Sequence, residues 1–373
     1  MAAESKMQYV NLGKSGLKVS KVILGAMSYG SSEWQEWVLN EAEALPLLKH
    51  AYDNGINTWD TADIYSHGRS EEIIGKALKQ YSIPREKVVI LSKCYFGVAE
   101  DGSQPPIAAS GANDGPELVN RVGLSRKHIL DAVDKSVARL GTYIDVLQIH
   151  RLDREVPKEE IMRALNDVVE SGKVRYIGAS SVSIPTTTTI IIIIIIIKKL
   201  TLTRIPKMAA WEFQMLQTIA ARHNWHRFIS MQNYHNLLYR EEEREMIPYC
   251  RATGVGIIPW SPIARGVLAR PFGSRGSTVR DKTDNFLQSL IRGQETETDA
   301  AVVGRVEEVA AKRGVSMAAV ATAWVLAKGE NPILGLSSKE RIEEAVRNSN
   351  FVLSDEEIKY LEEPYRPKVI TGH

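Results

Sequence analysis

The feature that most constrains the fold of this chain is a repeated alternation of short apolar runs with longer helical patterns. Eight runs rich in β-branched residues are typical of buried strands, at 19–27, 56–60, 87–94, 144–150, 174–180, 228–232, 255–261 and 332–336. Segments with helical periodicity lie between or after them, at 40–55, 68–81, 125–142, 157–172, 211–223, 241–254, 300–313, 316–328 and 338–349. This alternation indicates βαβ units that build a parallel sheet.

Eight such units predict an α/β protein in which residues 1–373 form a single (β/α)₈ TIM barrel. We expect an N-terminal β-hairpin at 7–20, a polar loop at 262–298 and extra C-terminal helices that end with 354–365. Ser125 is a predicted N-cap, and Ser354 begins the last helix with capping-box spacing to Glu357.

Composition argues against several classes of function. A formal net charge of +2 gives no electrostatic reason to expect nucleic acid or a membrane as partner. The two cysteines, Cys94 and Cys250, lie in different segments, so neither a disulfide framework nor a Cys-based zinc site is expected. The N-terminus has no apolar stretch typical of a secretion signal. We therefore expect a cytoplasmic protein whose partner is a small molecule.

Four chemically active side chains lie at or just past the ends of predicted strands: Asp60, Tyr65, Lys93 and His150. The carboxyl ends of barrel strands converge on one face, which is where catalysis occurs in this architecture. An ammonium beside a phenol favours the phenolate, so Lys93 is predicted to lower the pKa of Tyr65. Asp60 would hold Lys93 charged, and His150 would hydrogen-bond a substrate oxygen. Singly, each residue is better explained by packing or an ordinary ion pair; together they indicate protonation of a carbonyl oxygen.

These residues belong to a longer series of motifs that resembles the aldo-keto reductase superfamily over nearly the whole chain. The series runs WDTADIYSHGRSEEIIGKAL, LSK, LQIHRLD, VRYIGASS, MQNYHNLL, IPWSPIARG and GLSSKERIEEA. DVLQIHRLDR and NLLYREEEREMIPYC are most similar to fungal aryl-alcohol-dehydrogenase-like and versiconal-hemiacetal-acetate-reductase-like members. The resemblance implies an NADP-dependent oxidoreductase that reversibly reduces an aldehyde or ketone to an alcohol. It also implies that the four residues form a catalytic tetrad in which Tyr65 is the general acid.

The resemblance implies NADPH as the cofactor, and no predicted strand is followed by the GxGxxG fingerprint of a Rossmann fold. The nicotinamide carboxamide would be held by Ser180, Ser181 and Gln232, and the nicotinamide ring would stack on Trp260. The pyrophosphate would run along Ser261, Pro262, Ile263, Arg265 and Gly266. The adenosine end would be held by Gly335, Ser337, Ser338, Arg341 and Glu344.

Arg341 would contact the 2′-phosphate that distinguishes NADPH from NADH. The chain departs from the family pattern at Ser181 and at Ala345, since many members have Asn at these two positions. The predicted walls of the substrate pocket are Tyr29, Trp34 and Trp37, together with a long loop at 95–124. These aromatic residues favour an aromatic or bulky carbonyl, although packing explains each Trp about equally well.

The segment 182–207 interrupts the barrel pattern directly after Ser181 with four consecutive Thr and eight consecutive Ile. Its apolar part is much shorter than the ~20 residues that a transmembrane helix needs. A retained intron would explain it, because a Val codon begins with GT and a Lys codon can end with AG. The alternative is a genuine low-complexity insertion. Two functional alternatives also remain: a non-catalytic NADPH-sensing partner subunit of the same fold, or a chain that the insertion inactivates.

Overall fold

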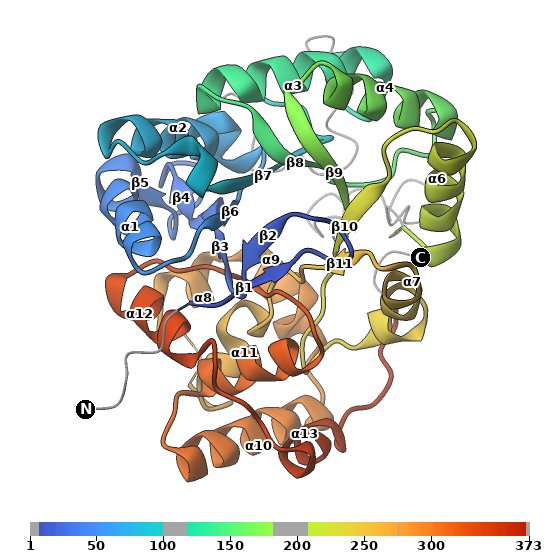
Figure 1. Cartoon of the computed structure of the whole chain (residues 1–373). Coiled ribbons are helices and arrows are strands. Elements are labelled where there is room, and N and C mark those ends of the chain that lie inside the picture. Colours follow the sequence, from blue (N-terminus) through green and yellow to red (C-terminus); the bar gives the residue numbers. More distant parts are fainter. Residues whose placement is uncertain (1–6, 100–117, 182–207, 275, 371–373) are drawn as a thin grey trace, which may run out of the picture.

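The computed structural model describes residues 7–99, 118–181, 208–274 and 276–370 (Figure 1). Its centre is a parallel sheet with the strand order β11-β10-β9-β8-β7-β6-β3-β12. The strands are β3 (Ile23–Gly25), β6 (Thr58–Asp60), β7 (Val89–Cys94), β8 (Ile144–Ile149), β9 (Val174–Ser180), β10 (Phe228–Gln232), β11 (Gly256–Ile257) and β12 (Ile333–Leu334). Trp260, just past β11, forms a parallel bridge with Ile333 of β12. This contact closes the ring, which confirms the predicted (β/α)₈ barrel.

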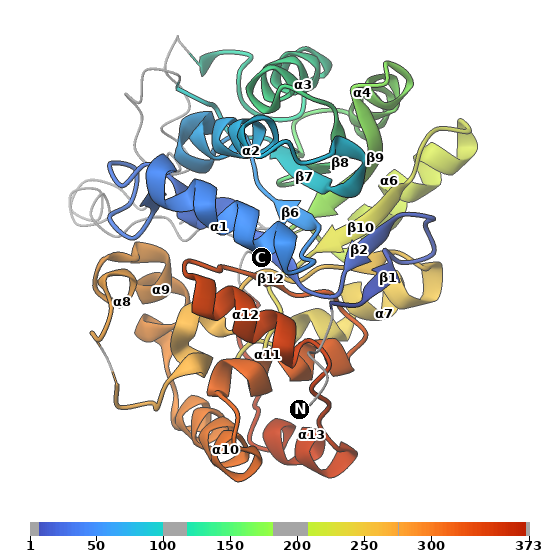
Figure 2. The same cartoon turned by 60° about the vertical axis from the view of Figure 1, so that its left-hand side comes forward.

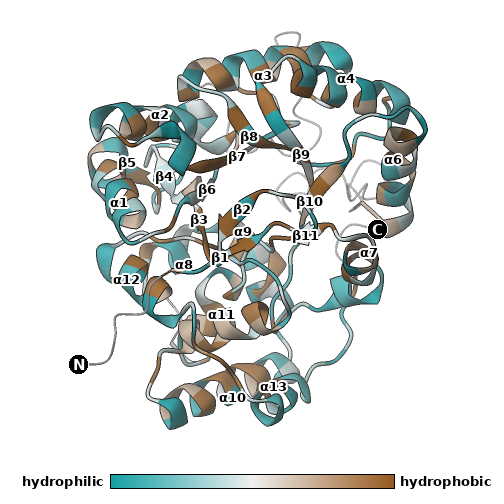
Figure 3. Ribbon diagram, in the orientation of Figure 1, coloured by the Kyte–Doolittle hydropathy of each residue, from teal (hydrophilic) through white to brown (hydrophobic). Residues whose placement is uncertain are grey.

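Helices cover the outside of the barrel (Figure 1). They are α1 (Glu41–Asp53), α2 (Arg69–Gln80), α3 (Arg126–Leu140), α4 (Lys158–Glu170), α6 (Ala210–Arg222), α7 (Met246–Thr253), α11 (Met317–Ala327) and α12 (Lys339–Asn348). Apolar and polar residues alternate along α2 and α4, and the apolar ones are buried, whereas α11 is apolar and buried over almost its whole length (Figure 3). β7 and β8 are buried along their whole length, because the barrel interior covers one face of each strand and helices cover the other.

A hairpin covers one end of the barrel, as predicted. Its strands, β1 (Tyr9–Asn11) and β2 (Lys18–Ser20), pair antiparallel. Leu12 and Val19 of this hairpin pack against Ile23, Leu91 and other residues of the barrel interior. Gly13 in its turn has a positive φ of 58°, and a Cβ atom there would lie 2.4 Å from the Gly254 carbonyl oxygen. The turn therefore requires glycine both for its conformation and for its close approach to the barrel.

The helix caps agree with the sequence predictions. The Ser125 hydroxyl accepts a hydrogen bond from the His128 backbone N–H, which caps α3. Ser354 and Glu357 form the predicted capping box of α13 (Asp355–Glu362). Each cap satisfies N–H groups that the first turn of a helix leaves without partners.

The structure corrects three element predictions. The predicted helix at 241–254 begins as the 3₁₀ turn η5 (Glu241–Arg244) before α7, and the predicted strand at 255–261 is regular only over β11. Residues 262–298 are not a simple loop. They contain the 3₁₀ turns η6 (Ala264–Ala269) and η7 (Arg292–Gln294) and two short helices, α8 (Val279–Thr283) and α9 (Asn285–Leu290). Figure 2 shows α8 and α9 at one side of the barrel.

The C-terminal part adds α10 (Glu297–Arg313) and α13 to the barrel (Figure 2). Among the helices described, none is by itself both long and apolar enough to cross a membrane; α10 and α11 pass that test only as a pair, bent by 101°. The segments 100–117 and 182–207 lie outside the described residues, and so do the predictions made for them.

Candidate active site

A cavity of about 810 Å³ opens at the carboxyl ends of the barrel strands. Its walls include residues that end or follow five different strands: Gly25, Asp60, His150, Gln232 and Leu334. A volume of this size is within the range of small-molecule and cofactor sites. The position agrees with the rule that barrel enzymes carry their sites at this end.

Lys93 is at the centre of the predicted tetrad. Its side chain is completely buried, and its ammonium donates to Asp60 Oδ2 at 2.6 Å, to the Thr61 carbonyl at 2.8 Å and to the Tyr65 hydroxyl oxygen at 3.2 Å. These three acceptors account for all three N–H donors of the ammonium. The Tyr65 oxygen thus accepts from Lys93, which leaves the phenolic proton available to another acceptor. Tyr65 also lines the cavity.

His150 completes the group. Its ring lies edge-on to Tyr65, with the ring centroids 6.0 Å apart, and it lines the same cavity. Its Nδ1 atom is buried and has no hydrogen-bond partner among the residues that the structure describes. The structure therefore brings all four predicted residues together from three strand ends, since Asp60 ends β6 and Tyr65 lies in the turn that follows it.

Asp60 is held by two amides in addition to Lys93. Its Oδ1 atom accepts hydrogen bonds from Gln148 Nε2 at 3.0 Å and from Gln232 Nε2 at 2.9 Å. Gln148 was not among the predicted site residues. Its place in β8, two residues before His150, was the available signal, because side chains two apart in a strand share a face. The two amides fix the carboxylate that orients Lys93.

The pKa directions follow from burial and neighbouring charge. Burial disfavours the charged form of Lys93, but attraction to Asp60 and Tyr65 is stronger, so the pKa of the ammonium is raised. Burial, together with the positive charges of Lys93 and Arg151, lowers the pKa of His150 well below its ordinary value. Near neutral pH, Lys93 is therefore charged and His150 is neutral.

The pKa of Tyr65 corrects a prediction. Burial raises this pKa and outweighs Lys93, which acts in the opposite direction as expected. Asp60 adds to the raising effect. The prediction considered only the ammonium, whereas the loss of water around the phenolate is the larger effect. Tyr65 is consequently a protonated phenol at neutral pH, which is the form that can donate a proton.

The residues predicted to hold nicotinamide fall into two groups. Gln232 and Trp260 line the cavity, and the Trp260 ring stacks on Tyr234 with the centroids 4.5 Å apart. Ser180 and Ser181 are buried and are not among the cavity-lining residues. The Ser180 hydroxyl and the Ser181 N–H both donate to the Gln232 carbonyl oxygen, at 3.1 and 3.0 Å. In this structure the two serines therefore fix the backbone of Gln232.

The turn after Trp260 forms the next part of the wall. The predicted residues Ser261, Pro262, Ile263, Arg265 and Gly266 all line the cavity. Ser261 and Arg265 have positive φ angles of 52° and 53°, which non-glycine residues rarely adopt. The Asn236 side-chain amide donates to the Ser261 carbonyl at 3.0 Å and supports this conformation. Strain of this kind is concentrated at functional sites.

The predicted adenosine end lies at the start of α12. Gly335, Ser337, Arg341 and Glu344 line the cavity, and Arg341 Nη1 donates to the Ser337 hydroxyl at 2.6 Å. Ser338 is not among the lining residues: its hydroxyl caps α12 by accepting from the Arg341 backbone N–H. Arg341 remains exposed.

Sequence reasoning missed Arg280 and Asp284, which belong to the segment predicted as a loop. Asp284 Oδ2 accepts from Arg265 Nη2 at 2.6 Å and from Arg280 Nε at 3.0 Å. Burial and the positive charge of Arg265 lower the pKa of Arg280 to about 10. A signal for α8 was present, because Thr278 has N-cap spacing to Asp281 and caps that helix. Arg280 lines the cavity, and its ion pair with Asp284 holds the side chain in that position.

The predicted substrate walls are only partly supported by the geometry. Trp37 lines the cavity, and the Arg280 guanidinium lies 4.2 Å from its ring centroid. Trp34 is not among the cavity-lining residues: it is buried against Tyr65, with the centroids 6.4 Å apart. Tyr29 is not a wall residue: it is fully buried in the main core, and its hydroxyl donates to the Leu336 carbonyl. Most of the predicted loop at 95–124 lies outside the described residues.

Comparison with known proteins agrees with the resemblance. A family model described as the aldo/keto reductase family matches residues 21–366. Versiconal hemiacetal acetate reductase of Aspergillus parasiticus is 62% identical over 365 residues, with 98% of each chain covered. A putative aryl-alcohol dehydrogenase of Schizosaccharomyces pombe is 53% identical, with 100% of this chain and 99% of the relative covered. By motif order, barrel fold and these matches, the chain belongs to the aldo-keto reductase family.

Proposed function

We propose that this protein is an NADPH-dependent reductase that converts an aldehyde or ketone to an alcohol, reversibly. One observation carries the proposal: Lys93 donates to both Asp60 and Tyr65 at the wall of a large cavity, with neutral His150 beside them. Family membership supports carbonyl reduction with a nicotinamide cofactor. The choice of NADPH over NADH and the role of Tyr65 are the finer parts of the proposal.

The residues of the cavity fit a nicotinamide dinucleotide. Among the described residues, four arginines line it, Arg265, Arg270, Arg280 and Arg341, and their guanidinium groups suit a ligand with several phosphates. Gly335 borders this region, and a Cβ atom there would lie 3.7 Å from Arg280 Nη1, so a larger side chain would take space from the ligand. Trp260 presents an aromatic ring whose buried Nε1 has no hydrogen-bond partner. NADPH would extend from Trp260 to Arg341.

The tetrad supplies the proton. When bound, NADPH supplies the hydride that reaches the carbonyl carbon. Tyr65 donates its phenolic proton to the carbonyl oxygen. The proton is free for this transfer because Lys93 donates a hydrogen bond to the hydroxyl oxygen and does not accept one from it. Lys93 stabilises the phenolate that remains, and Asp60 keeps the ammonium charged and in place. His150 can donate one hydrogen bond from its neutral ring to the same substrate oxygen.

The substrate proposed is an aromatic or bulky carbonyl compound. Trp37 on the cavity wall and Trp34 against Tyr65 provide apolar, aromatic surface close to the tetrad. Relatives named for aryl alcohols and for versiconal hemiacetal acetate support the same class.

The test is a spectrophotometric assay of NADPH oxidation with a panel of aromatic and aliphatic aldehydes and ketones. We expect turnover that depends on the carbonyl compound and is faster with NADPH than with NADH. Saturable NADPH binding without turnover on any carbonyl would instead support the sensing subunit. The assay is run on the chain with and without 182–207, so that inactivity caused by the insertion is recognised.

A further inference from the structure

Arg151 directly follows His150 and is a buried cation for which the described residues provide no hydrogen-bond or ion-pair partner. Only 3% of its surface is exposed, and its Nε, Nη1 and Nη2 atoms are all buried without a hydrogen-bond acceptor. Its guanidinium lies 4.8 Å from the centroid of the Phe96 ring, which attracts it but accepts no ordinary hydrogen bond. A buried guanidinium with five unsatisfied N–H donors is costly, so its retention requires an explanation.

The nearest carboxylate after Arg151 in the sequence, that of Asp153, makes its hydrogen bonds to backbone groups and not to Arg151. Asp153 accepts from the backbone N–H groups of Leu124 at 2.8 Å and Glu155 at 3.0 Å. Arg154, three residues further on, forms a bidentate pair with Glu212, with both N···O distances 2.7 Å. The two arginines of this segment thus differ: within the part of the chain that the structure describes, Arg154 pairs with a carboxylate and Arg151 does not. Burial lowers the pKa of Arg151 to about 10, which still leaves it charged at neutral pH.

Arg151 lies close to the catalytic group. The Phe96 ring that it contacts is also edge-on to His150, with the centroids 5.1 Å apart. Phe96 belongs to the same apolar cluster as Trp34 and Tyr65. The indole Nε1 atom of Trp34 is a further buried donor without a partner. Arg151, Phe96 and Trp34 do not line the cavity themselves, but Phe96 contacts His150 and Trp34 contacts Tyr65, which both do. Directly behind these two wall residues, the described part of the chain therefore leaves buried donors unsatisfied, which suits a ligand rich in acceptor oxygens.

We propose that Arg151 binds a carboxylate of the substrate, so that the preferred carbonyl compounds are aromatic oxo acids. A carboxylate matches the planar fork of a guanidinium and can accept two parallel hydrogen bonds. Phe96 would support the flat face of the guanidinium. This inference rests on the proposed function, since it assigns a substrate class to the same reductase.

The experiment compares carboxybenzaldehyde with the smaller, neutral methylbenzaldehyde, each as the ortho, meta and para isomer. For the wild-type protein, we expect kcat/KM for at least one carboxylated isomer to exceed the value for the corresponding methyl isomer about tenfold or more. A charge-assisted hydrogen bond contributes enough free energy for a difference of this size. In Arg151→Met, which keeps the apolar stem, that ratio should fall by about the same factor. Arg154→Met is the matched control, because it removes one positive charge from the same segment, and it should keep the wild-type ratio.

Calorimetric titration with benzoate measures the subsite independently of turnover. Binding should be about tenfold weaker in Arg151→Met than in wild type and unchanged in Arg154→Met. If no aldehyde is reduced but benzoate behaves in this way, the proposed reaction fails and the carboxylate site stands. A wild-type protein that neither prefers a carboxylated isomer nor binds benzoate overturns the inference, even if Arg151→Met does not fold. Equal effects of the two Met variants would overturn it as well.

Discussion

The Tyr65 hydroxyl shows how one residue depends on its surroundings at this site. Burial keeps it protonated, and the Lys93 ammonium, 3.2 Å away, is positioned to stabilise the phenolate once the proton has left. Two opposing influences therefore act on one oxygen atom. The protein holds the acid in its donating form and compensates the charge that donation creates.

At Tyr65, the decisive substitution is Tyr65→Phe. It removes the proton donor and keeps the ring that packs against Trp34. Carbonyl reduction should fall by about 10²–10⁴-fold, the usual contribution of a general acid, while NADPH binding should change little. Steady-state NADPH oxidation and quenching of protein fluorescence measure the two quantities. A variant with more than about a tenth of wild-type turnover would show that Tyr65 is not the acid.

At Arg341, the expected effect is on cofactor choice. Arg341→Ala should weaken the binding of NADPH by roughly 1.5–3 kcal/mol, which is the contribution of a charge-assisted contact to the 2′-phosphate. The binding of NADH should be weakened much less. Fluorescence titration with both cofactors gives the two dissociation constants. Arg347→Ala is the control, because Arg347 is exposed on the same helix α12 but does not line the cavity. Equal losses for NADPH and NADH would exclude Arg341 as the phosphate contact.

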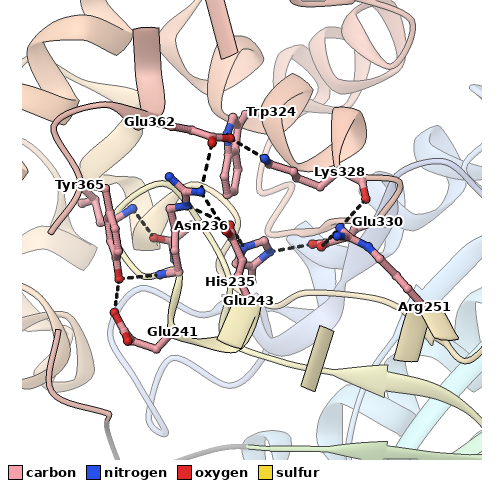
Figure 4. A network of polar contacts seen from close by, with 12 residues as sticks. His235, Asn236, Glu241, Glu243, Arg251, Trp324, Lys328, Glu330, Glu362 and Tyr365 are labelled. Atoms are coloured by element: carbon pink, nitrogen blue, oxygen red, sulfur yellow. Dashed lines mark hydrogen bonds and ion pairs between the residues drawn. The ribbon is translucent and has the colours of Figure 1, made fainter. Parts of the chain in front are cut away.

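At the scale of an element, the segment after β10 connects the cavity wall to the C-terminal helices. The Asn233 carbonyl accepts from the Trp260 N–H at 2.9 Å, and Tyr234 stacks on the Trp260 ring. His235, the next residue, is held in a network of charged side chains (Figure 4). Its Nδ1 atom lies 2.7 Å from Glu330 and its Nε2 atom 3.0 Å from Glu243. The residues that position Trp260 are therefore anchored on their other side.

This network predicts a destabilising effect for Glu330→Gln. Glu330 and His235 are both buried, so loss of the carboxylate removes a charge-assisted hydrogen bond of roughly 1.5–3 kcal/mol. The free energy of unfolding from urea titration measures the loss. Glu363→Gln is the control, because its pair with Arg305 is exposed and should contribute less than about 1 kcal/mol. Similar losses in the two variants would contradict the importance of the buried pair.

The effect of Glu330→Gln should also depend on pH. Burial opposes the charge on His235, but Glu243 and Glu330 outweigh it, so the folded-state pKa is raised above 6.5. A raised pKa gives stability that is fully present below pH 6.5 and is lost as the pH rises through the folded-state value. The loss in Glu330→Gln should therefore be larger below pH 6.5 than at strongly alkaline pH. A loss independent of pH would show that the charge on His235 does not contribute.

At the scale of the whole molecule, two apolar clusters support the cavity. The larger one lies between the barrel strands and their surrounding helices, for example at Trp59 and Phe213. The second joins α10, α11 and α13 to the turn η6 through residues such as Trp324 and Leu268. Trp260 and Ile263 pack against the second cluster and line the cavity. The proposed cofactor site therefore depends on the C-terminal helices as well as on the barrel.

Removal of residues 182–207 should give a more soluble and more active protein. The flanking residues are already in contact, since the Met208 N–H donates to the Ser181 hydroxyl at 3.3 Å. A chain that passes directly from Ser181 to Met208 therefore requires little change in the described barrel. The removed segment contains an uncharged run of eight Ile, which is prone to β-aggregation. Soluble yield, thermal unfolding and NADPH oxidation test the deletion; an unfolded or inactive deletion protein would show that the segment is integral.

The residue pattern alone predicted the alternation of strands and helices, and with it the place where Asp60, Tyr65, Lys93 and His150 meet. Periodicity and capping are local properties, and in a barrel they suffice because every strand ends on the same face. Three features became visible in the folded molecule alone: the direction in which the pKa of Tyr65 shifts, the place of Tyr29 in the core, and the lack of a carboxylate beside Arg151 among the described residues. Burial and ion pairing depend on which distant segments surround a side chain, and the spacing of residues along the chain does not predict those neighbours.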